Sequence, residues 1–208
     1  MISTVFQFTR RNVIYFLLLS PAGLLAQKLG DDERSAAMTH LYVSRMKFLN
    51  SIAGLSPEQL AFKAGPDRWS IAECAEHITL SEDLIFKMAE RALAVPAAKR
   101  EPAVYLRVDQ QILKSMVNRD KKGKAPEALK PSNKWKTMDA MIADFKERRK
   151  KTIEWVERTD ADVRGHAVPH PEFKELDAFQ WVLLLSAHTE RHTLQILEVR
   201  AEEIFPKK

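Results

Sequence analysis

WVLLLSAHTERH, residues 181–192, carries the strongest periodic pattern in the chain. Its apolar side chains recur at intervals of three and four residues, which is the spacing of one face of an α-helix. The stripe extends over about residues 177–204, so we expect one long helix there. Two histidines interrupt this apolar face. The inward positions are Trp181, Leu184, Leu185, His188, His192, Gln195 and Val199.

Three further long helices are predicted from the same periodicity. Ser70 and Glu73 form a capping-box pattern, in which each side chain bonds to the backbone amide of the other, so a helix is expected to begin there. Gly54 and Pro96 follow two of the periodic stretches and are expected to end them. The predicted helices cover about residues 31–52, 70–93 and 137–158.

The connection between the second and third long helices is unusually long. Residues 94–134 hold one more predicted helix, over about 102–119, and then a Lys- and Pro-rich stretch, 120–133, that is expected to be a surface loop. Such a length suits a crossover between parallel neighbours in a bundle. Residues 160–176 are expected to form another loop. The sequence therefore predicts an all-α fold, a four-helix bundle with a long crossover between helices 2 and 3.

Composition narrows the class of protein. A chain of 208 residues corresponds to one domain, with or without a short appendage. With 45% hydrophobic and 29% charged residues it can bury a core, which excludes a disordered chain. Cys74 is the single cysteine, so there is no intrachain disulfide and no CxxC motif, and we interpret it as a small buried residue.

The net charge of +5 is spread along the chain and gives no reason to expect a nucleic-acid partner. Its densest basic segment is the run KERRKK, residues 146–151. On the outer face of a helix such a run is more often solvated than bound to an anion. We therefore interpret it as a solvent-facing surface.

The first 26 residues have the order of an export signal. They contain no acidic residue and no lysine, and Arg10 and Arg11 precede an uncharged apolar run over 13–26. This run of 14 residues is shorter than the roughly 20 needed to span a bilayer. We expect cleavage near Ala26 and export of residues 27–208 as one domain without a transmembrane span. A membrane anchor and a buried apolar helix are the alternatives, and the choice between general secretion and twin-arginine export stays open.

His188 and His192 are four residues apart, so they lie one turn above the other on the same side of their helix. Burying a neutral imidazole without a partner costs roughly a few kcal/mol. A divalent metal would explain the pair, because two such rings can converge on one ion at about 2.1 Å. The residues between them differ from the HExxH motif of zincins, and the pair alone leaves surface or hydrogen-bonded core histidines as alternatives.

His77 is the candidate third ligand. It lies in the second long helix on a largely apolar face shared with Cys74, Ser81, Leu84 and Met88. Alone, it would be interpreted as a core histidine with a hydrogen-bond partner. Inward side chains of facing helices do, however, build metal sites in bundles. Three histidines would leave at least one coordination position open, as in catalytic sites.

Four other side chains are candidates to support such a site. Glu73 lies one turn before His77 and could face the site, although its capping role is the better explanation. Gln195, three residues after the second histidine of the pair, could hydrogen-bond to a ligand or a bound water. His166 and His170 lie in the loop that could overhang the site.

Three segments together resemble the DinB-like superfamily: LSPEQL (55–60), RWSIAECAEH (68–77) and HTERHTLQI (188–196). The pattern of that family is a Trp-Ser helix start leading to one histidine, with HxxxH followed by Gln-Ile near the C-terminus. HPEF, residues 170–173, is also similar to the family's His-Pro-x-Phe-Gly segment, although Lys174 stands in place of the glycine.

The resemblance covers about residues 35–201 and implies a four-helix bundle with a divalent metal, commonly nickel or zinc, held by His77, His188 and His192. Family members with known activity include metal-dependent thiol S-transferases, which join bacillithiol or mycothiol to electrophiles, and a maleylpyruvate isomerase. Some members are homodimers, so a homodimer is a further expectation.

The resemblance leads us to expect a metal-dependent enzyme that acts on a small molecule, as a thiol transferase or a hydrolase. Export would weaken the first of these, because low-molecular-weight thiols are mainly cytosolic. The alternatives are a non-catalytic bundle that binds a metal or ligand, and a metal-free bundle that makes protein–protein contacts.

Overall fold

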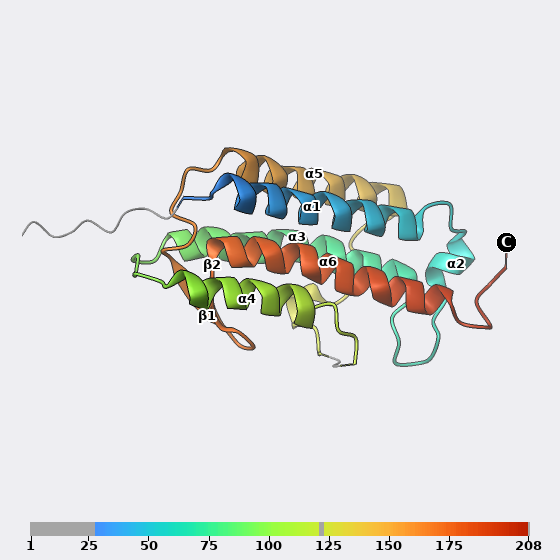
Figure 1. Ribbon diagram of the computed structural model, residues 1–208. Coiled ribbons are helices and arrows are strands. Elements are labelled where there is room, and N and C mark those ends of the chain that lie inside the picture. Colours follow the sequence, from blue (N-terminus) through green and yellow to red (C-terminus); the bar gives the residue numbers. More distant parts are fainter. Residues whose placement is uncertain (1–27, 121–122, 208) are drawn as a thin grey trace, which may run out of the picture.

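The computed structural model describes residues 28–120 and 123–207 (Figure 1). The predicted export signal, residues 1–26, lies outside the described residues. The described residues form six α-helices, one 3₁₀ turn and one two-stranded hairpin, and the four long helices confirm the predicted all-α bundle. The elements are α1 (Asp31–Ile52), α2 (Pro57–Ala61), α3 (Ile71–Leu93), α4 (Pro102–Ser115), η1 (Glu127–Leu129), α5 (Met138–Arg158), β1 (Ala167–His170), β2 (Lys174–Asp177) and α6 (Ala178–Arg200).

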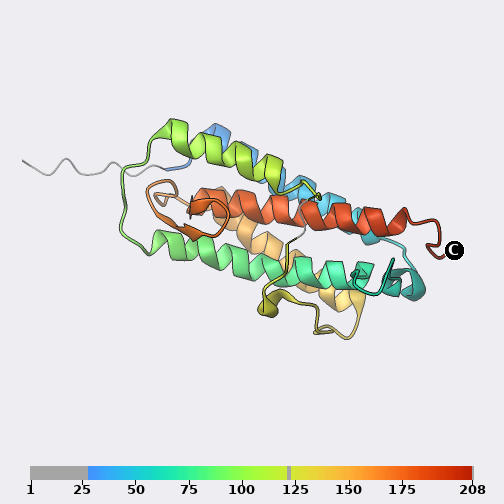
Figure 2. The same ribbon diagram turned by 90° about the horizontal axis from the view of Figure 1, so that it is seen from below.

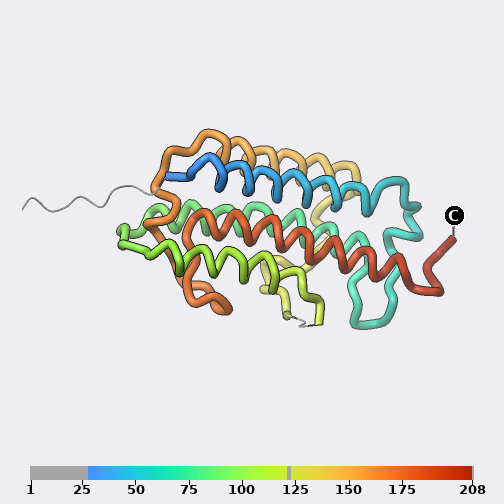
Figure 3. Tube along the Cα trace, in the orientation of Figure 1, coloured from blue at the N-terminus to red at the C-terminus, as the bar shows by residue number. Residues whose placement is uncertain are grey.

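The long helices lie in two layers, α1 beside α5 and α3 beside α6, with α4 packed on the outer side of α6 (Figures 1 and 2). Helices α3 and α5 run in the same direction. This follows from their contacts, since a later residue of α3 meets a later residue of α5. Asp83 pairs with Arg148, and further along Phe86 packs against Trp155 with ring centroids 5.5 Å apart. The described parts of residues 94–134 therefore form the predicted crossover between parallel neighbours, and Figure 3 shows its α4 portion.

Helices α3 and α6 begin where side chains bond to the free backbone amides of the first turn. At α3 the Ser70 amide donates to Glu73 Oε2 at 2.7 Å, and the Glu73 amide donates to Ser70 Oγ at 3.1 Å. This confirms the predicted capping box. The same reciprocal arrangement begins α6, where Asp177 and Gln180 bond to each other's amides at 2.7 and 3.0 Å.

The core consists of two apolar clusters separated by a layer of buried polar side chains. One cluster includes Leu41, Ile85 and Val156, and the other includes Phe48, Ile78 and Phe145. The layer between them, here called the polar layer, is formed by one residue from each long helix. Its members are Ser44, Glu82, Arg149 and Thr189, all buried.

The interpretation of residues 146–151 as a wholly solvent-facing run is wrong for Arg149. Its side chain is fully buried, because position 149 falls on the same inward stripe of α5 as Phe145 and Thr152. A buried charge must be paired, and Glu82 of α3 supplies the partner. The local charge run gave no sign of this partner, which lies far away in the sequence.

Three predicted boundaries also change. Residues 160–176 are more than a loop, because β1 and β2 pair antiparallel, with His170 opposite Lys174. Lys174 has φ of 67°, a left-handed conformation that glycine adopts most easily, which fits the glycine that the DinB-like pattern has at this place.

Helix α4 ends at Ser115 and α6 at Arg200, before the predicted 119 and 204. Every helix among the described residues is too short or too polar to cross a lipid bilayer.

Candidate metal centre

His77, His188 and His192 meet in one cluster. One ring nitrogen from each lies within 4.8 Å of the other two, and Nε2 of His77 is 3.2 Å from Nε2 of His188. The ring centroids are 4.3–4.9 Å apart. Two imidazole nitrogens bound to one tetrahedral ion at about 2.1 Å would be about 3.4 Å apart. His77 and His188 already have about this spacing, so the three donors can bind one ion once His192 moves close enough to both.

The cluster exists because α3 and α6 run antiparallel in contact. The start of α3 lies at the end of α6, where Arg68 pairs with Glu202 at 2.6 Å. His77, about two turns into α3, then reaches the level of His188 and His192. The helical spacing of the pair and the antiparallel packing together bring all three rings to one point.

Two of the rings are oriented by hydrogen bonds from their other nitrogen. His77 Nδ1–H donates to the Leu129 carbonyl at 2.8 Å, and His192 Nδ1–H donates to Gln195 Oε1 at 2.9 Å. Because both partners are acceptors, they place the proton on Nδ1 and leave the lone pair on Nε2. Metal-ligating histidines are oriented in this way. His188 Nδ1 is buried and has no hydrogen-bond partner within residues 28–120 and 123–207.

Burial keeps the three imidazoles in the form that binds a metal. It lowers the pKa of His77, lowers that of His188 well below its ordinary value, and lowers that of His192 to about 3. Repulsion from a neighbouring ring in its protonated form lowers the pKa further: His192 and His77 act in this way on His188, and His77 acts on His192. All three are therefore neutral at neutral pH, as ligation requires.

Trp69 forms one wall of the cluster. Its ring centroid is 4.9 Å from that of His77 and 6.2 Å from that of His192. His77 is only 3% exposed, whereas His188 and His192 are half-buried, so the more exposed part of the cluster lies on α6. Trp69 directly precedes Ser70, the N-cap of α3, so its contact with His192 joins the start of α3 to α6.

Glu73 and Gln195 have different roles around the cluster. Glu73 accepts from the Ser70 amide and pairs with Lys63 at 2.7 Å, so its carboxylate serves the start of α3. Gln195 bonds directly to the ring of His192. Of these two candidates, the structure thus brings Gln195 into contact with a cluster histidine and engages Glu73 in helix capping.

His170 supports the hairpin turn. Its Nδ1 accepts from the amides of Glu172 and Phe173 at 3.1 and 3.2 Å, and its ring lies 5.2 Å from that of Trp181. Trp181 belongs to the same inward stripe of α6 as the histidine pair. His170 thereby holds the turn against α6 through Trp181.

The remaining sequence candidates have structural partners. His166 Nδ1–H donates to the Val95 carbonyl and links the hairpin to the crossover. Cys74 is buried, and burial raises the pKa of its thiol to about 12. Its thiol is therefore protonated at neutral pH, which confirms the interpretation as a small buried residue.

One contact of the site could not have been found in the sequence. The acceptor for His77 is a backbone carbonyl, that of Leu129, and every residue carries such a group. Only the path of the crossover past α3 reveals which carbonyl it is. The guanidinium of Arg191, whose charge helps lower the pKa of His188, is likewise bound to a crossover carbonyl, that of Met116, at 3.0 Å.

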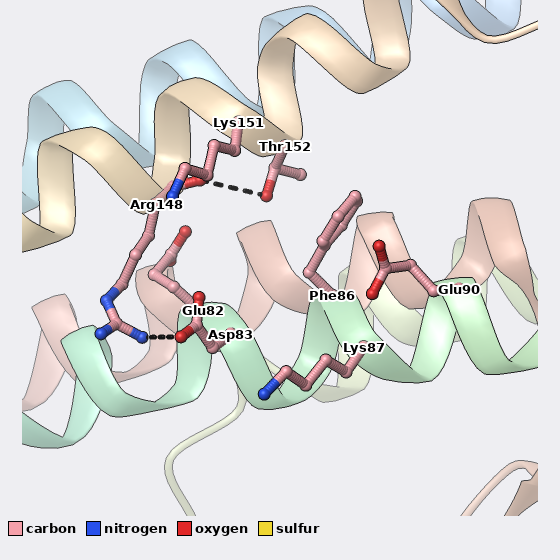
Figure 4. Close-up of a pocket in the computed structure, with 8 residues that line it drawn as sticks. All are labelled: Glu82, Asp83, Phe86, Lys87, Glu90, Arg148, Lys151 and Thr152. Atoms are coloured by element: carbon pink, nitrogen blue, oxygen red, sulfur yellow. Dashed lines mark hydrogen bonds and ion pairs between the residues drawn. The ribbon is translucent and has the colours of Figure 1, made fainter.

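A separate hollow of about 180 Å³ lies between α3 and α5 (Figure 4). The ion pair between Arg148 and Asp83 crosses it, and none of the three cluster histidines lines it. Glu82 lies at its edge with its carboxylate bonded to Arg149. The hollow thus belongs to the helix seam and not to the histidine cluster.

Comparison with known proteins gives three matches. Residues 40–196 match the family model of the DinB superfamily. Uncharacterized protein YuaE of Bacillus subtilis (strain 168) is 25% identical over 157 residues, which cover 76% of this chain and 93% of YuaE. The solved structure of YfiT from Bacillus subtilis, described as a probable metal-dependent hydrolase with an unusual four-helix bundle topology, aligns with a TM-score of 0.55. That alignment covers 84% of this chain and 89% of YfiT at 13% identity, so it concerns the fold alone.

Proposed function

The chain belongs to the DinB superfamily, and from this membership and its histidine geometry we propose that it binds a divalent metal, zinc or nickel, and acts as a metal-dependent enzyme on a small molecule. One observation carries the proposal. Three neutral imidazoles converge, and in two of them Nδ1–H is bonded to an acceptor, so that Nε2 carries the lone pair that can bind a metal. His77, His188 and His192 are the proposed ligands.

The side chains of the cluster suit this chemistry. Neutral ligands leave the full charge of a divalent ion available to a substrate. The chemistry that such an ion supplies when bound is Lewis acidity, which activates water for hydrolysis or a thiol for transfer. Trp69 shields the cluster on one side, and His188 and His192 are its partly exposed members, so we expect a small molecule to approach from α6.

We propose hydrolysis as the reaction, ahead of thiol transfer. The description of YfiT as a probable metal-dependent hydrolase supports this order. The expected export of the chain supports it as well, because low-molecular-weight thiols are mainly cytosolic. The test is a panel of chromogenic esters, amides and lactones beside a thiol-conjugation assay with a nitroaryl halide. Conjugation without hydrolysis would reverse the order.

A second candidate function is non-catalytic binding of a metal or small ligand. This function is favoured because the carboxylates nearest to the histidines in the sequence are already bound to other groups. Glu73 caps α3, Glu76 accepts backbone amides, and Glu190 pairs with Lys47 of α1. A hydrolase needs a group that moves protons, and these three are committed to other contacts. Tight metal binding with no turnover across the panel would select this function.

Metal binding itself is tested by elemental analysis of the purified protein. We expect about one equivalent of zinc or nickel in the wild type, bound by three ligands. The His188→Ala variant is expected to lose it, whereas the matched His40→Ala variant, altered on α1, should retain it. Equal metal content in wild type and His188→Ala would reject the assignment of ligands.

Export with cleavage near Ala26 is also a proposal, supported by Arg10, Arg11 and the apolar run that follows. N-terminal sequencing of the protein recovered outside the cytoplasm tests the cleavage position. Retention in the membrane fraction with an intact start would select the anchored alternative. A double change, Arg10→Lys with Arg11→Lys, should block twin-arginine export and leave general secretion intact.

A further inference from the structure

Glu76 holds a segment of the crossover by its backbone. Its side chain is buried, 5% exposed, and lies on α3. Oε1 accepts from the amides of Ser132 and Lys134 at 2.9 and 3.0 Å, and Oε2 accepts from the amide of Asn133 at 3.1 Å. Three consecutive amides thus point at one carboxylate.

This arrangement is an anion-binding turn occupied by a side chain of the same protein. Successive amides converge in this way when one residue adopts the left-handed conformation, and Asn133 has φ of 58°. Asn tolerates that conformation better than other residues with a β-carbon. Hydrogen bonds to a carboxylate are stronger than those to a neutral acceptor, so Glu76 fixes this turn firmly.

The next residue on α3 uses the same segment. His77 donates through Nδ1–H to the Leu129 carbonyl. Only Lys130 and Pro131 separate Leu129 from the turn held by Glu76, and proline fixes its own φ angle. The position of the Leu129 carbonyl is therefore coupled through a short, stiff link to the carboxylate of Glu76.

We propose that Glu76 is a positioning residue for the histidine cluster: it holds residues 129–134 so that the Leu129 carbonyl keeps the proton of His77 on Nδ1. This role of Glu76 rests on the proposed function in one respect, namely that His77 is a metal ligand. The position of the proton is a property of the metal-free chain and can be measured independently.

The tautomer of His77 is the first measurement, made by ¹⁵N NMR of the ring nitrogens in the metal-free protein. Wild type should show the Nδ1–H form. Glu76→Gln places an amide donor against a backbone amide donor, which should release the turn and give a mixture of tautomers. Asp144→Asn is the matched control, because Asp144 accepts from the nearby Trp135 indole at 3.1 Å and has no hydrogen bond to the described backbone of residues 129–134. It should leave the tautomer unchanged.

A second pair of variants changes the turn itself, at Asn133, and leaves Glu76 unchanged. Asn133→Val places a β-branched residue at a positive φ and should distort the turn while Glu76 stays intact. Asn133→Gly accepts that φ and should behave like wild type. If circular dichroism shows that Glu76→Gln does not fold, these two Asn133 variants test whether the turn fixes the tautomer of His77.

Affinity for zinc alone is the third measurement. Changing a group that orients a metal ligand typically costs about 10–100-fold in affinity, and we expect about tenfold for Glu76→Gln and Asn133→Val because they act through the turn. Both controls should stay within about twofold of wild type. A wild-type tautomer and affinity in Glu76→Gln would overturn the inference, as would an equal loss in Asp144→Asn. A wild type that binds neither zinc nor nickel would refute the proposed function, and the tautomers would still decide the role of Glu76.

Discussion

Arg149 and Glu82 form a two-pronged ion pair in the centre of the bundle. Arg149 Nε is 2.8 Å from Oε2 of Glu82, and Nη2 is 2.6 Å from Oε1. Arg149 also donates to the Leu41 carbonyl, Ser44 Oγ and Thr189 Oγ1, each at 2.8 Å. A single guanidinium thus bonds to the three other long helices.

Breaking this pair from one side should destabilise the fold strongly. Arg149→Met leaves the carboxylate of Glu82 buried without its partner, which typically costs about 3–5 kcal/mol. Urea denaturation measures the loss. The double variant Glu82→Leu with Arg149→Met should recover most of it, because no unpaired charge remains. A single-variant cost below about 1 kcal/mol would contradict the pairing.

Gln195 should matter for metal affinity and not for folding. Gln195→Leu keeps the size of the side chain but removes the acceptor for His192 Nδ1–H, so the ring loses its orientation. We expect zinc affinity to fall about 10–100-fold, measured by competition with a chelating dye. Leu194→Gln, at an exposed neighbouring position on α6, is the control and should bind zinc as wild type does. Equal affinities in wild type and Gln195→Leu would exclude this role.

Acid should weaken the metal-free fold through the buried histidines. The unfolded chain takes up protons on these rings as the pH falls below about 6.5, whereas in the fold the pKa of His192 is lowered to about 3. The unfolded state then binds more protons, so this contribution to stability is present above about pH 6.5 and is lost as the pH falls toward 3. Melting temperatures of metal-free protein between pH 8 and 4 measure it.

The matched variant for the acid effect is His192→Ala, which removes one of the titrating rings. Its melting temperature should fall less steeply with acidification than that of wild type. Parallel slopes for the two proteins would show that His192 is not held neutral in the fold.

Cys74 should be inert in the native protein. Its thiol is buried and its pKa is raised to about 12, so the reactive thiolate is scarce. A disulfide reagent such as dithionitrobenzoate should label it only slowly at pH 8 and rapidly in 6 M guanidinium chloride. Fast labelling without denaturant would instead indicate an accessible, reactive thiol near His77.

The sequence predicted the features that depend on local chemistry. Helical periodicity located α1, α3, α5 and α6, and the Ser70–Glu73 pattern located the start of α3. The spacing of His188 and His192 predicted that they share a side of α6. His77 could be assigned only as a candidate from its apolar face, and the family resemblance added the expectation that it joins the pair.

Features that depend on distant partners were not predictable. Arg149 sits in a run of charges that is typical of a solvent-facing helix surface, and its partner Glu82 lies on another helix. Glu76 looks like any helical glutamate until the crossover is placed against it. Pairing of β1 with β2 was missed because two strands of four residues each are too short to show a clear alternation.

The polar layer has a consequence for how the helices slide against one another. Moving α5 by one turn, about 5.4 Å, would carry Arg149 into one of the apolar clusters and leave Glu82 facing hydrocarbon. Each long helix contributes one member, so a shift of any of them breaks hydrogen bonds of this layer. Thr189 is the member adjacent to His188 in the chain, and Glu82 follows His77 on α3. The same charges that forbid slippage therefore keep the imidazoles of α3 and α6 level with each other.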